Sequence, residues 1–123
     1  MPKKILIVDD EPEIIDLLEM RLNRYGYKII TAFDGMEGLE KARKEIPDLI
    51  ILDVMMPRMD GYSVCRMLKY DEKYKKIPII IFTSRSQEAD KVTGKEVGAD
   101  AYVPKPFEPD HLVKEVKRLL GDK

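Results

Sequence analysis

Carboxylate, hydroxyl and ammonium side chains stand at or just after the ends of four short apolar runs in this 123-residue chain. They are Asp9, Asp10, Asp53, Thr83 and Lys105. Three carboxylates close together raise one another's pKa values unless a cation lies among them, and carboxylates with water are ligands that suit Mg²⁺. A lysine ammonium is a good partner for phosphate oxygens. The set therefore indicates phosphoryl transfer to a carboxylate, with Asp53 as nucleophile and with a metal ion and Lys105 neutralising the phosphoryl charge.

These side chains converge only if the apolar runs are parallel strands whose carboxyl ends share one edge of a sheet. The runs are short and mostly β-branched, which is typical of strands covered on both faces. Segments with helical spacing alternate with them, and right-handed crossovers then produce a doubly wound parallel sheet with helices on both faces. We therefore predict one α/β domain over residues 1–123 with a five-stranded (βα)5 sheet. The predicted strands are 5–8, 28–32, 49–52, 79–82 and 101–103, and the predicted helices are 12–25, 35–46, 61–68, 87–97 and 109–120.

Each of the polar residues also has an ordinary structural interpretation. Paired acids after a strand are often a solvated turn, a threonine at a strand end is usually a cap, and a lysine between prolines is usually a loop residue. Taken one at a time, this interpretation is the better one for Asp9-Asp10, for Thr83 and for Lys105. Their joint placement at the ends of four strands is what favours a functional site.

Charge and composition exclude several classes of partner. The formal net charge is -1 and the sequence pI is about 5.9, so the chain has no basic surface for nucleic acid or anionic lipid. No apolar stretch approaches the length of a membrane span, and the charged N-terminus does not resemble a signal peptide. Cys65 is the only cysteine, which excludes an internal disulfide and favours a reducing compartment. We expect a cytoplasmic protein with no direct contact to nucleic acid or membrane, and with Cys65 packed inside the domain.

Four motifs resemble those of the receiver domains of two-component response regulators, and the resemblance covers essentially the whole chain. It implies a flavodoxin-like fold with strand order 2-1-3-4-5. It leaves open whether the chain is a stand-alone receiver, like the chemotaxis regulators, or part of a longer regulator. The motifs are Val8-Asp9-Asp10, Leu52-Asp53-Val54-Met55-Met56-Pro57-Arg58-Met59-Asp60-Gly61, Phe82-Thr83-Ser84 and Lys105-Pro106-Phe107.

The resemblance implies a role for each acidic residue of the site. Asp53 would be the phosphoacceptor. Mg²⁺, with Mn²⁺ as the alternative ion, would be held by Asp10, Asp53 and the backbone carbonyl of Met55. Asp9 would contribute to the metal site through water.

The remaining site residues are also implied by the resemblance. Thr83 would contact the phosphoryl group, and Lys105 would pair with it. The bond between Lys105 and Pro106 would be cis, a geometry that is costly except before proline. Met55 and Arg85 occupy the positions that tune the lifetime of the phosphoryl group in this family.

A conformational switch is a further implication. Thr83 would be drawn toward the phosphoryl oxygens while Tyr102 turns from an exposed to an inward position. The two movements would reshape the surface formed by the helix at 87–97, the strand at 101–103 and the helix at 109–120. The 87–97 segment has only a thin apolar stripe, so it should shift easily. The alternative for Tyr102 is an edge-strand aromatic that packs on the last helix.

The implied function is a phosphoacceptor switch and not an enzyme, although the domain would assist its own phosphorylation and a slow autodephosphorylation. A sensor histidine kinase or a phosphotransfer protein would supply the phosphoryl group. The switched surface would control a downstream protein or an output domain absent from this sequence. We expect a monomer or a weak phosphorylation-dependent dimer.

Three other functions compete with this one. A Mg²⁺-dependent aspartyl-phosphate phosphatase or phosphotransferase usually needs a second carboxylate two residues after the nucleophile, where this chain has Met55. A flavin- or nucleotide-binding module should carry Gly, Ser or Thr amides after its first strand, where this chain has Asp9-Asp10-Glu11. A receiver-like module that works without phosphorylation is disfavoured because all five chemical residues are retained. The methionines at 55, 56 and 59 fit either an adaptable docking surface or loop packing.

Overall fold

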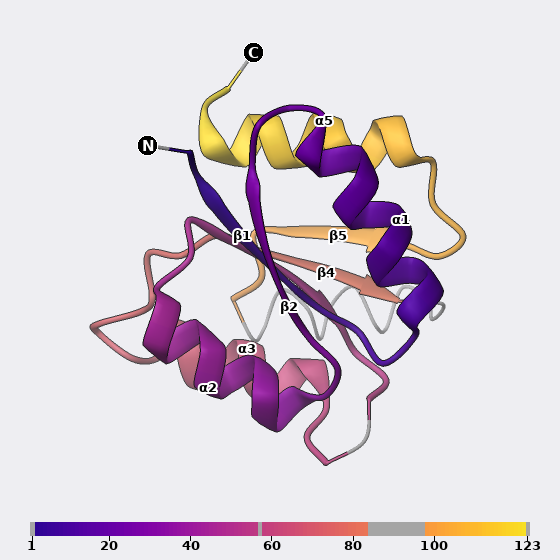
Figure 1. The fold of residues 1–123 in the computed structure, drawn as a ribbon. Coiled ribbons are helices and arrows are strands. Elements are labelled where there is room, and N and C mark those ends of the chain that lie inside the picture. The colour runs from indigo at the N-terminus through magenta and orange to yellow at the C-terminus, as the bar shows by residue number, and fades with distance from the viewer. Residues whose placement is uncertain (1, 57, 84–97, 123) are drawn as a thin grey trace.

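The computed structural model describes residues 2–56, 58–83 and 98–122, with the backbone but not the side chain of Thr83. Five parallel strands form one sheet in the order β2-β1-β3-β4-β5, which confirms the predicted flavodoxin-like α/β topology (Figure 1). The helix predicted at 87–97 lies outside the described residues. The strands are β1 (Lys4–Val8), β2 (Lys28–Ala32), β3 (Leu49–Asp53), β4 (Ile79–Thr83) and β5 (Ala101–Pro104). The described helices are α1 (Pro12–Asn23), α2 (Gly35–Glu45), α3 (Gly61–Lys69) and α5 (Pro109–Leu120).

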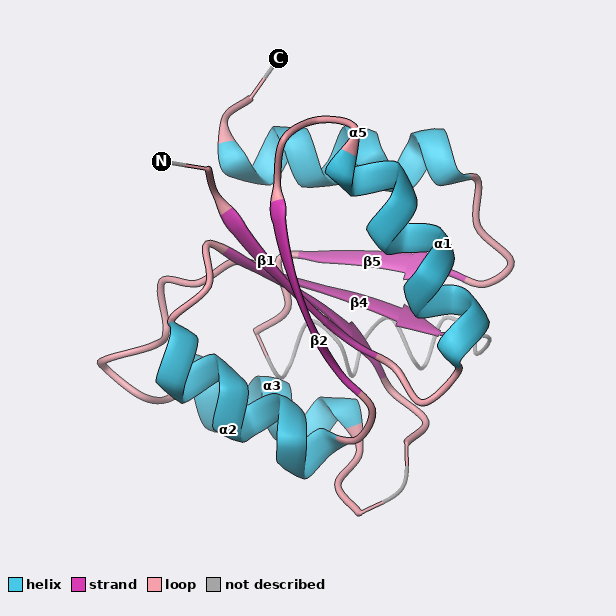
Figure 2. Ribbon diagram, viewed as in Figure 1, coloured by secondary structure: helices cyan, strands magenta, loops and turns pink. Residues whose placement is uncertain are grey.

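The central strands are apolar because helices cover both faces of the sheet (Figure 2). Every residue of β3 is buried, and so is every residue of β1 except Lys4. The parallel register places Val8 of β1 beside Leu52 of β3, and Asp53 beside Phe82 of β4. The carboxyl ends of β1, β3 and β4 therefore meet at one edge, as the strand-end pattern predicted.

Two apolar clusters lie on opposite faces of the sheet. Helices α1 and α5 cover one face, and α2 and α3 cover the other (Figure 1). Cys65 of α3 is completely buried, which confirms its predicted packing role. None of the helices in the described ranges is long and apolar enough to cross a membrane. The first face buries Ile15, Leu18, Leu22, Leu112, Val113 and Val116, and the second buries Leu39, Ala42, Val64, Cys65 and Leu68.

Aspartate side chains cap the starts of α2 and α3, near the site. The side chain of Asp34 accepts a hydrogen bond from the backbone N–H of Glu37 at the start of α2, and Asp60 does the same for Ser63 at the start of α3. The predicted helix at 35–46 ends one residue early. Ile46 takes a left-handed conformation, with φ 45°, and is 51% exposed, so it caps α2 instead of extending its apolar face.

Hydrogen bonds and an ion pair join the two chain ends at the edge of the sheet where β1 and β2 begin. The Nζ of Lys3 donates to the carbonyl oxygen of Leu120 (2.7 Å) and to Oδ1 of Asp122 (2.8 Å). The hydroxyl of Tyr27 donates to Oδ2 of Asp122 (2.7 Å). The end of α5 is thus fastened to the segments that enter β1 and β2, far from the strand ends that carry the acids.

Candidate functional site

Asp9 and Asp53 lie side by side because their strands are neighbours in the sheet. Asp9 directly follows β1, and its backbone N–H donates to the carbonyl oxygen of Ala32, which extends the strand pairing by one residue. Asp53 is the last residue of β3. Both side chains are buried, an unusual state for carboxylates and one that needs a compensating partner.

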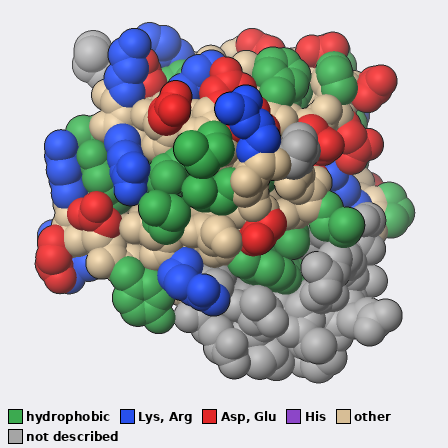
Figure 3. Space-filling view, turned by 90° about the horizontal axis from the view of Figure 1, so that it is seen from below, with side chains coloured by type: hydrophobic (Ala, Val, Ile, Leu, Met, Phe, Trp, Pro, Cys, Tyr) green, Lys and Arg blue, Asp and Glu red, His purple; other side chains and the backbone are tan. Residues whose placement is uncertain are grey.

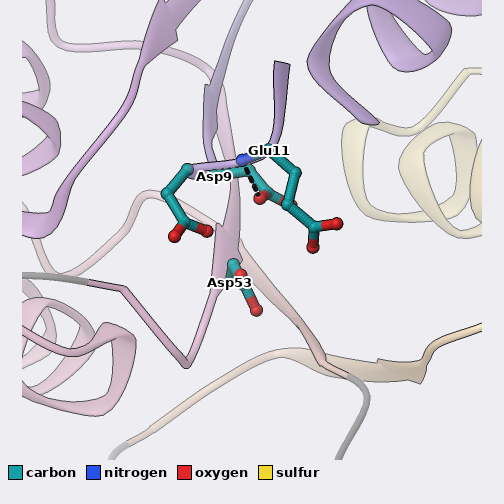
Figure 4. A group of neighbouring side chains, drawn as sticks. Asp9, Glu11 and Asp53 are labelled. Atoms are coloured by element: carbon teal, nitrogen blue, oxygen red, sulfur yellow. Dashed lines mark hydrogen bonds between the residues drawn. The ribbon is translucent and has the colours of Figure 1, made fainter. Parts of the chain in front are cut away.

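Four carboxylates gather at this edge of the sheet. One oxygen from each of Asp9, Asp10, Glu11 and Asp53 lies within 4.8 Å of the others. Figure 4 shows Asp9 and Glu11, which follow β1, near Asp53 at the end of β3; the Glu11 backbone N–H donates to Oδ1 of Asp9 at 2.9 Å. Asp10 and Glu11 are exposed, so water reaches the cluster from one side. A set of carboxylate oxygens open to water fits a hard divalent cation such as Mg²⁺.

Lys105 supplies the positive charge that contacts this cluster. Its Nζ lies 3.0 Å from Oδ2 of Asp9, 3.1 Å from Oε1 of Glu11 and 3.6 Å from Oδ2 of Asp53. The ammonium also lies 4.7 Å from the centre of the Phe82 ring, and the lysine side chain is only 10% exposed. The Lys105-Pro106 peptide bond is cis, as predicted. Among the described residues, the four carboxylates outnumber this one ammonium, so this part of the site carries excess negative charge.

Burial, together with the neighbouring charges, shifts the pKa values of the site. Burial, and then the charge of Asp9, raise the pKa of Asp53 to about 6 against the opposing effects of Lys105 and of the Val54 and Met55 backbone N–H groups. Burial also raises the pKa of Asp9. Burial pulls the pKa of Lys105 down, but its contacts with Asp9 and Asp53 outweigh this and raise it. A bound cation would relieve the repulsion between the two buried carboxylates.

A glycine fits the start of α3 against the backbone of Asp53. A Cβ atom on Gly61 would lie 2.1 Å from the carbonyl oxygen of Asp53, a distance that no side chain tolerates. The Gly61 N–H donates to the carbonyl oxygen of Val54 at 2.9 Å, which closes the loop between β3 and α3. Met55, in that loop, is 58% exposed. The loop is therefore fastened directly to the strand end that carries Asp53.

The predicted site residues are only partly accounted for. The structure brings together Asp9, Asp10, Asp53 and Lys105. The Thr83 side chain and the whole of Arg85 lie outside the described residues. Glu11 is a member of the cluster that the sequence interpretation did not assign, although its place directly after Asp9-Asp10 was the available signal.

Tyr102 is half-buried in β5 and packs against the apolar cluster on the α2–α3 face. Helix α5 lies on the opposite face of the sheet. The alternative interpretation, an edge-strand aromatic packed on the last helix, is therefore wrong. Its role as a switch residue stays a prediction.

Comparisons with known proteins bear on the family. A family model described as the response regulator receiver domain matches residues 5–117. The alkaline phosphatase synthesis transcriptional regulatory protein PhoP of Bacillus subtilis (strain 168) is 50% identical over 120 residues, which make up 98% of this chain and 49% of that protein. The chemotaxis response regulator CheY4 of Vibrio cholerae has a similar structure, with a TM-score of 0.91 and 38% identity over 98% of this chain and 100% of that chain.

A second similar structure belongs to a sensor histidine kinase. The receiver domain of a sensor histidine kinase from Pseudomonas aeruginosa PAO1, with a magnesium ion coordinated in its active-site cleft, has a TM-score of 0.89 and 29% identity over 99% of this chain and 100% of that chain.

This chain spans about half the length of the curated relatives it matches. The family match runs from β1 into α5 and so includes every strand of the sheet. The chain belongs to the family of response regulator receiver domains of two-component systems.

Proposed function

We propose that this domain is a phosphoacceptor switch of a two-component relay, in which Asp53 takes a phosphoryl group from the phosphohistidine of a sensor histidine kinase or a phosphotransfer protein. The observation that carries the proposal is the buried Asp53 carboxylate, 3.6 Å from the Lys105 ammonium and within a cluster of three further carboxylates. Membership of the receiver family supports the same function.

The residues of the chain have separate tasks in the transfer. One oxygen of the ionised Asp53 carboxylate attacks phosphorus, the bond from phosphorus to the imidazole nitrogen breaks, and the imidazole leaves with a proton from solvent. Lys105 neutralises charge on the phosphoryl oxygens, and Thr83 donates a hydrogen bond to one of them. Lys105 is held at hydrogen-bond distance from Asp9 and Glu11 but not from Asp53, so the attacking carboxylate keeps an oxygen without a lysine hydrogen bond.

Asp10, Asp53 and the backbone carbonyl of Met55, with Asp9 acting through water, are the residues that would hold Mg²⁺ or Mn²⁺. When bound, the ion supplies positive charge that keeps Asp53 ionised and offsets the negative charge of the incoming phosphoryl group. The fit rests on the donor set, which consists of carboxylate oxygens partly open to water. The exposed side chain of Met55, and Arg85, would then adjust how fast water removes the phosphoryl group.

The output of the switch would be read from the surface that includes β5 and α5, with Thr83 and Tyr102 coupling it to Asp53. The chain covers about half of its curated relatives, and one of these is named as a transcriptional regulatory protein. Both facts support control of an attached output domain, with a separate downstream protein as the other target. We propose a cytoplasmic domain that is monomeric, or dimerises weakly after phosphorylation, and sedimentation before and after phosphorylation tests this.

Intact mass spectrometry tests the phosphoacceptor directly. The domain is incubated with Mg²⁺ and acetyl phosphate, beside an Asp53→Asn variant and an Asp16→Asn control on the exposed side of α1. We expect one added phosphoryl group in the wild-type and Asp16→Asn proteins, dependent on Mg²⁺, and none in Asp53→Asn. Modification of Asp53→Asn to the same extent would move the acceptor elsewhere. No modification of the wild-type protein, by acetyl phosphate or by a panel of phosphorylated histidine kinases, would refute the proposal.

A further inference from the structure

A shallow groove of about 660 Å³ lies beside the site, where the β3–α3 loop meets the outer side of α3. It does not include the acidic cluster. Methionines and arginines make up most of its lining. Its lining residues are Met56, Arg58, Met59, Asp60, Ser63, Arg66 and Met67.

The apolar part of the groove is adaptable and partly exposed. Met56 and Met59 pack with part of their surface against the core cluster on the α2–α3 face, and Met67 of α3 is 42% exposed. Figure 3 looks onto this side of the molecule and shows hydrophobic side chains lying next to basic ones. Methionine is flexible and polarisable, so it suits surfaces that accept apolar side chains of different shapes.

The polar part of the groove carries two arginines, of which one is paired within the domain and one has no ion-pair partner among the described residues. Arg66 is exposed and is not a member of any ion pair found among the described residues. Arg58 forms an ion pair with Asp34 at 3.5 Å, and its side chain is still 69% exposed. The Asp60 carboxylate is already engaged at the start of α3, where it accepts from the N–H and the hydroxyl of Ser63. Arg66 is therefore the stronger attachment point for a partner carboxylate, and the exposed part of Arg58 is a second one.

The backbone around the groove is held in place on two sides. A Cβ atom on Gly35 would lie 1.9 Å from the carbonyl oxygen of Met59, so the first turn of α2 presses directly on the groove segment. Gly61 closes the other end of the segment against Asp53. Arg58 also has φ 73°, a left-handed conformation that is uncommon for residues other than glycine. The backbone that carries Met59 and Asp60 is thus fixed against α2 and against the end of β3, so this part of the groove does not have to be ordered on binding.

We propose that this groove is a docking site for an acidic, amphipathic segment of a partner protein. Apolar side chains of the segment would lie against Met56, Met59 and Met67, and its carboxylates would pair with Arg58 and Arg66. Arginine and carboxylate form bidentate pairs, so such a segment is favoured over a basic or a neutral one. The proposal is independent of phosphoryl transfer. A consequence of the proposal is that a partner can bind this domain near Asp53 and leave the β5–α5 surface uncovered.

Selection from a display library of short random peptides tests the proposal on the unmodified domain. We expect the selected peptides to be enriched in Asp and Glu together with large apolar residues. Their affinity should fall about tenfold or more with Arg66→Glu, because the variant replaces an attraction with a repulsion. Met67→Ser should weaken them as well. Arg24→Glu, at the end of α1 on the other face of the sheet, reverses the same charge and should change nothing. The thermal midpoint of each variant shows that it is folded.

Several outcomes would overturn the proposal. Selected peptides without an acidic bias, peptides whose binding ignores Arg66→Glu and Met67→Ser, or no enrichment at all would each do so. Self-association of the domain that disappears with Arg66→Glu, seen by sedimentation, would assign the groove to a second copy of the chain instead. Phosphorylation of Asp53 by acetyl phosphate is measured separately, so failure here leaves the proposed function intact.

Discussion

Replacing Asp53 with asparagine should stabilise the metal-free protein at neutral and alkaline pH. The carboxylate is buried beside Asp9, and burial followed by the charge of Asp9 raises its pKa from 3.8 to about 6. Asparagine keeps the shape of the side chain and an oxygen that accepts the backbone N–H groups of Val54 and Met55, but it removes the charge. The domain should therefore gain free energy of unfolding at the expense of its phosphoacceptor.

The pKa shift sets the size and pH range of this gain. Folded protein binds the Asp53 proton more tightly than the unfolded chain, so its stability falls as pH rises from about 4 to about 6 and stays reduced above that. The pKa of Asp53 is about two higher in the folded protein than in the unfolded chain, which corresponds to a loss of at most about 3 kcal/mol in the free energy of unfolding. Loss of the attraction between Asp53 and Lys105 reduces the net gain in the variant. We expect Asp53→Asn to gain about 1–3 kcal/mol at about pH 8 and nothing below about pH 4.

Urea unfolding followed by far-ultraviolet circular dichroism measures the gain, because the chain has no tryptophan for a fluorescence signal. The titration is run in EDTA at several pH values for the wild-type protein, for Asp53→Asn and for Asp16→Asn. Asp16 is exposed on α1, so its variant should follow the wild-type protein at every pH. Mg²⁺ should stabilise the wild-type protein at about pH 8 and narrow its difference from Asp53→Asn.

Two results would refute this reasoning. If Asp53→Asn were less stable than the wild-type protein in EDTA at about pH 8, the charge of Asp53 would be satisfied by its neighbours without a cation. If the difference were the same at low and high pH, it would come from packing and not from the ionisation of Asp53.

Three further predictions concern the parts of the fold that support the site. Gly61→Ala should lower the free energy of unfolding by roughly 2–4 kcal/mol, because the alanine Cβ would collide with the Asp53 carbonyl oxygen. Urea unfolding measures this loss, and unchanged stability would contradict the close contact. Cys65 should react with a thiol reagent only as fast as the domain unfolds, because its thiol is buried and burial raises its pKa to about 12. Rapid labelling of the native protein would contradict this and would show that α3 opens locally. Tyr27→Phe should lower the free energy of unfolding by about 1 kcal/mol, because it removes the hydrogen bond to Asp122. The urea midpoint measures the change, and an unchanged midpoint would mean that water replaces this bond.

Local patterns in the sequence were sufficient for the elements and their order of appearance. Continuous apolar runs such as 49–52 can be buried on both faces only within a covered sheet, and their alternation with helical segments leaves a parallel sheet as the simple solution. The start of α5 at Pro109 and the end of β2 at Ala32 were also predicted correctly. Boundaries decided by backbone conformation were less accessible, and Ile46 shows why. Its apolar side chain continues the helical pattern, yet the chain turns left-handed there and exposes it.

The tertiary structure decided how neighbouring residues of the same type differ. Asp9 and Asp10 are adjacent and chemically identical, but the first is buried and the second exposed, because successive residues at a strand end point to opposite sides. Glu11 follows Asp9-Asp10 directly in the sequence, but it joins the cluster only because the chain turns back toward Asp9 before α1 begins. The face on which Tyr102 packs followed from the register of β5 against β4.

Residue types along the chain determined by themselves which chemistry the edge of the sheet can perform, because carboxylates, an ammonium and strand-forming runs are local properties. Only the folded arrangement determined the charge that this edge carries. The pKa of Asp53 and the distances from Lys105 to its partners depend on burial and on contacts between segments about 50 to 100 residues apart. Such interactions fall off with distance in space and not with distance along the chain, so they exist only once the sheet has formed.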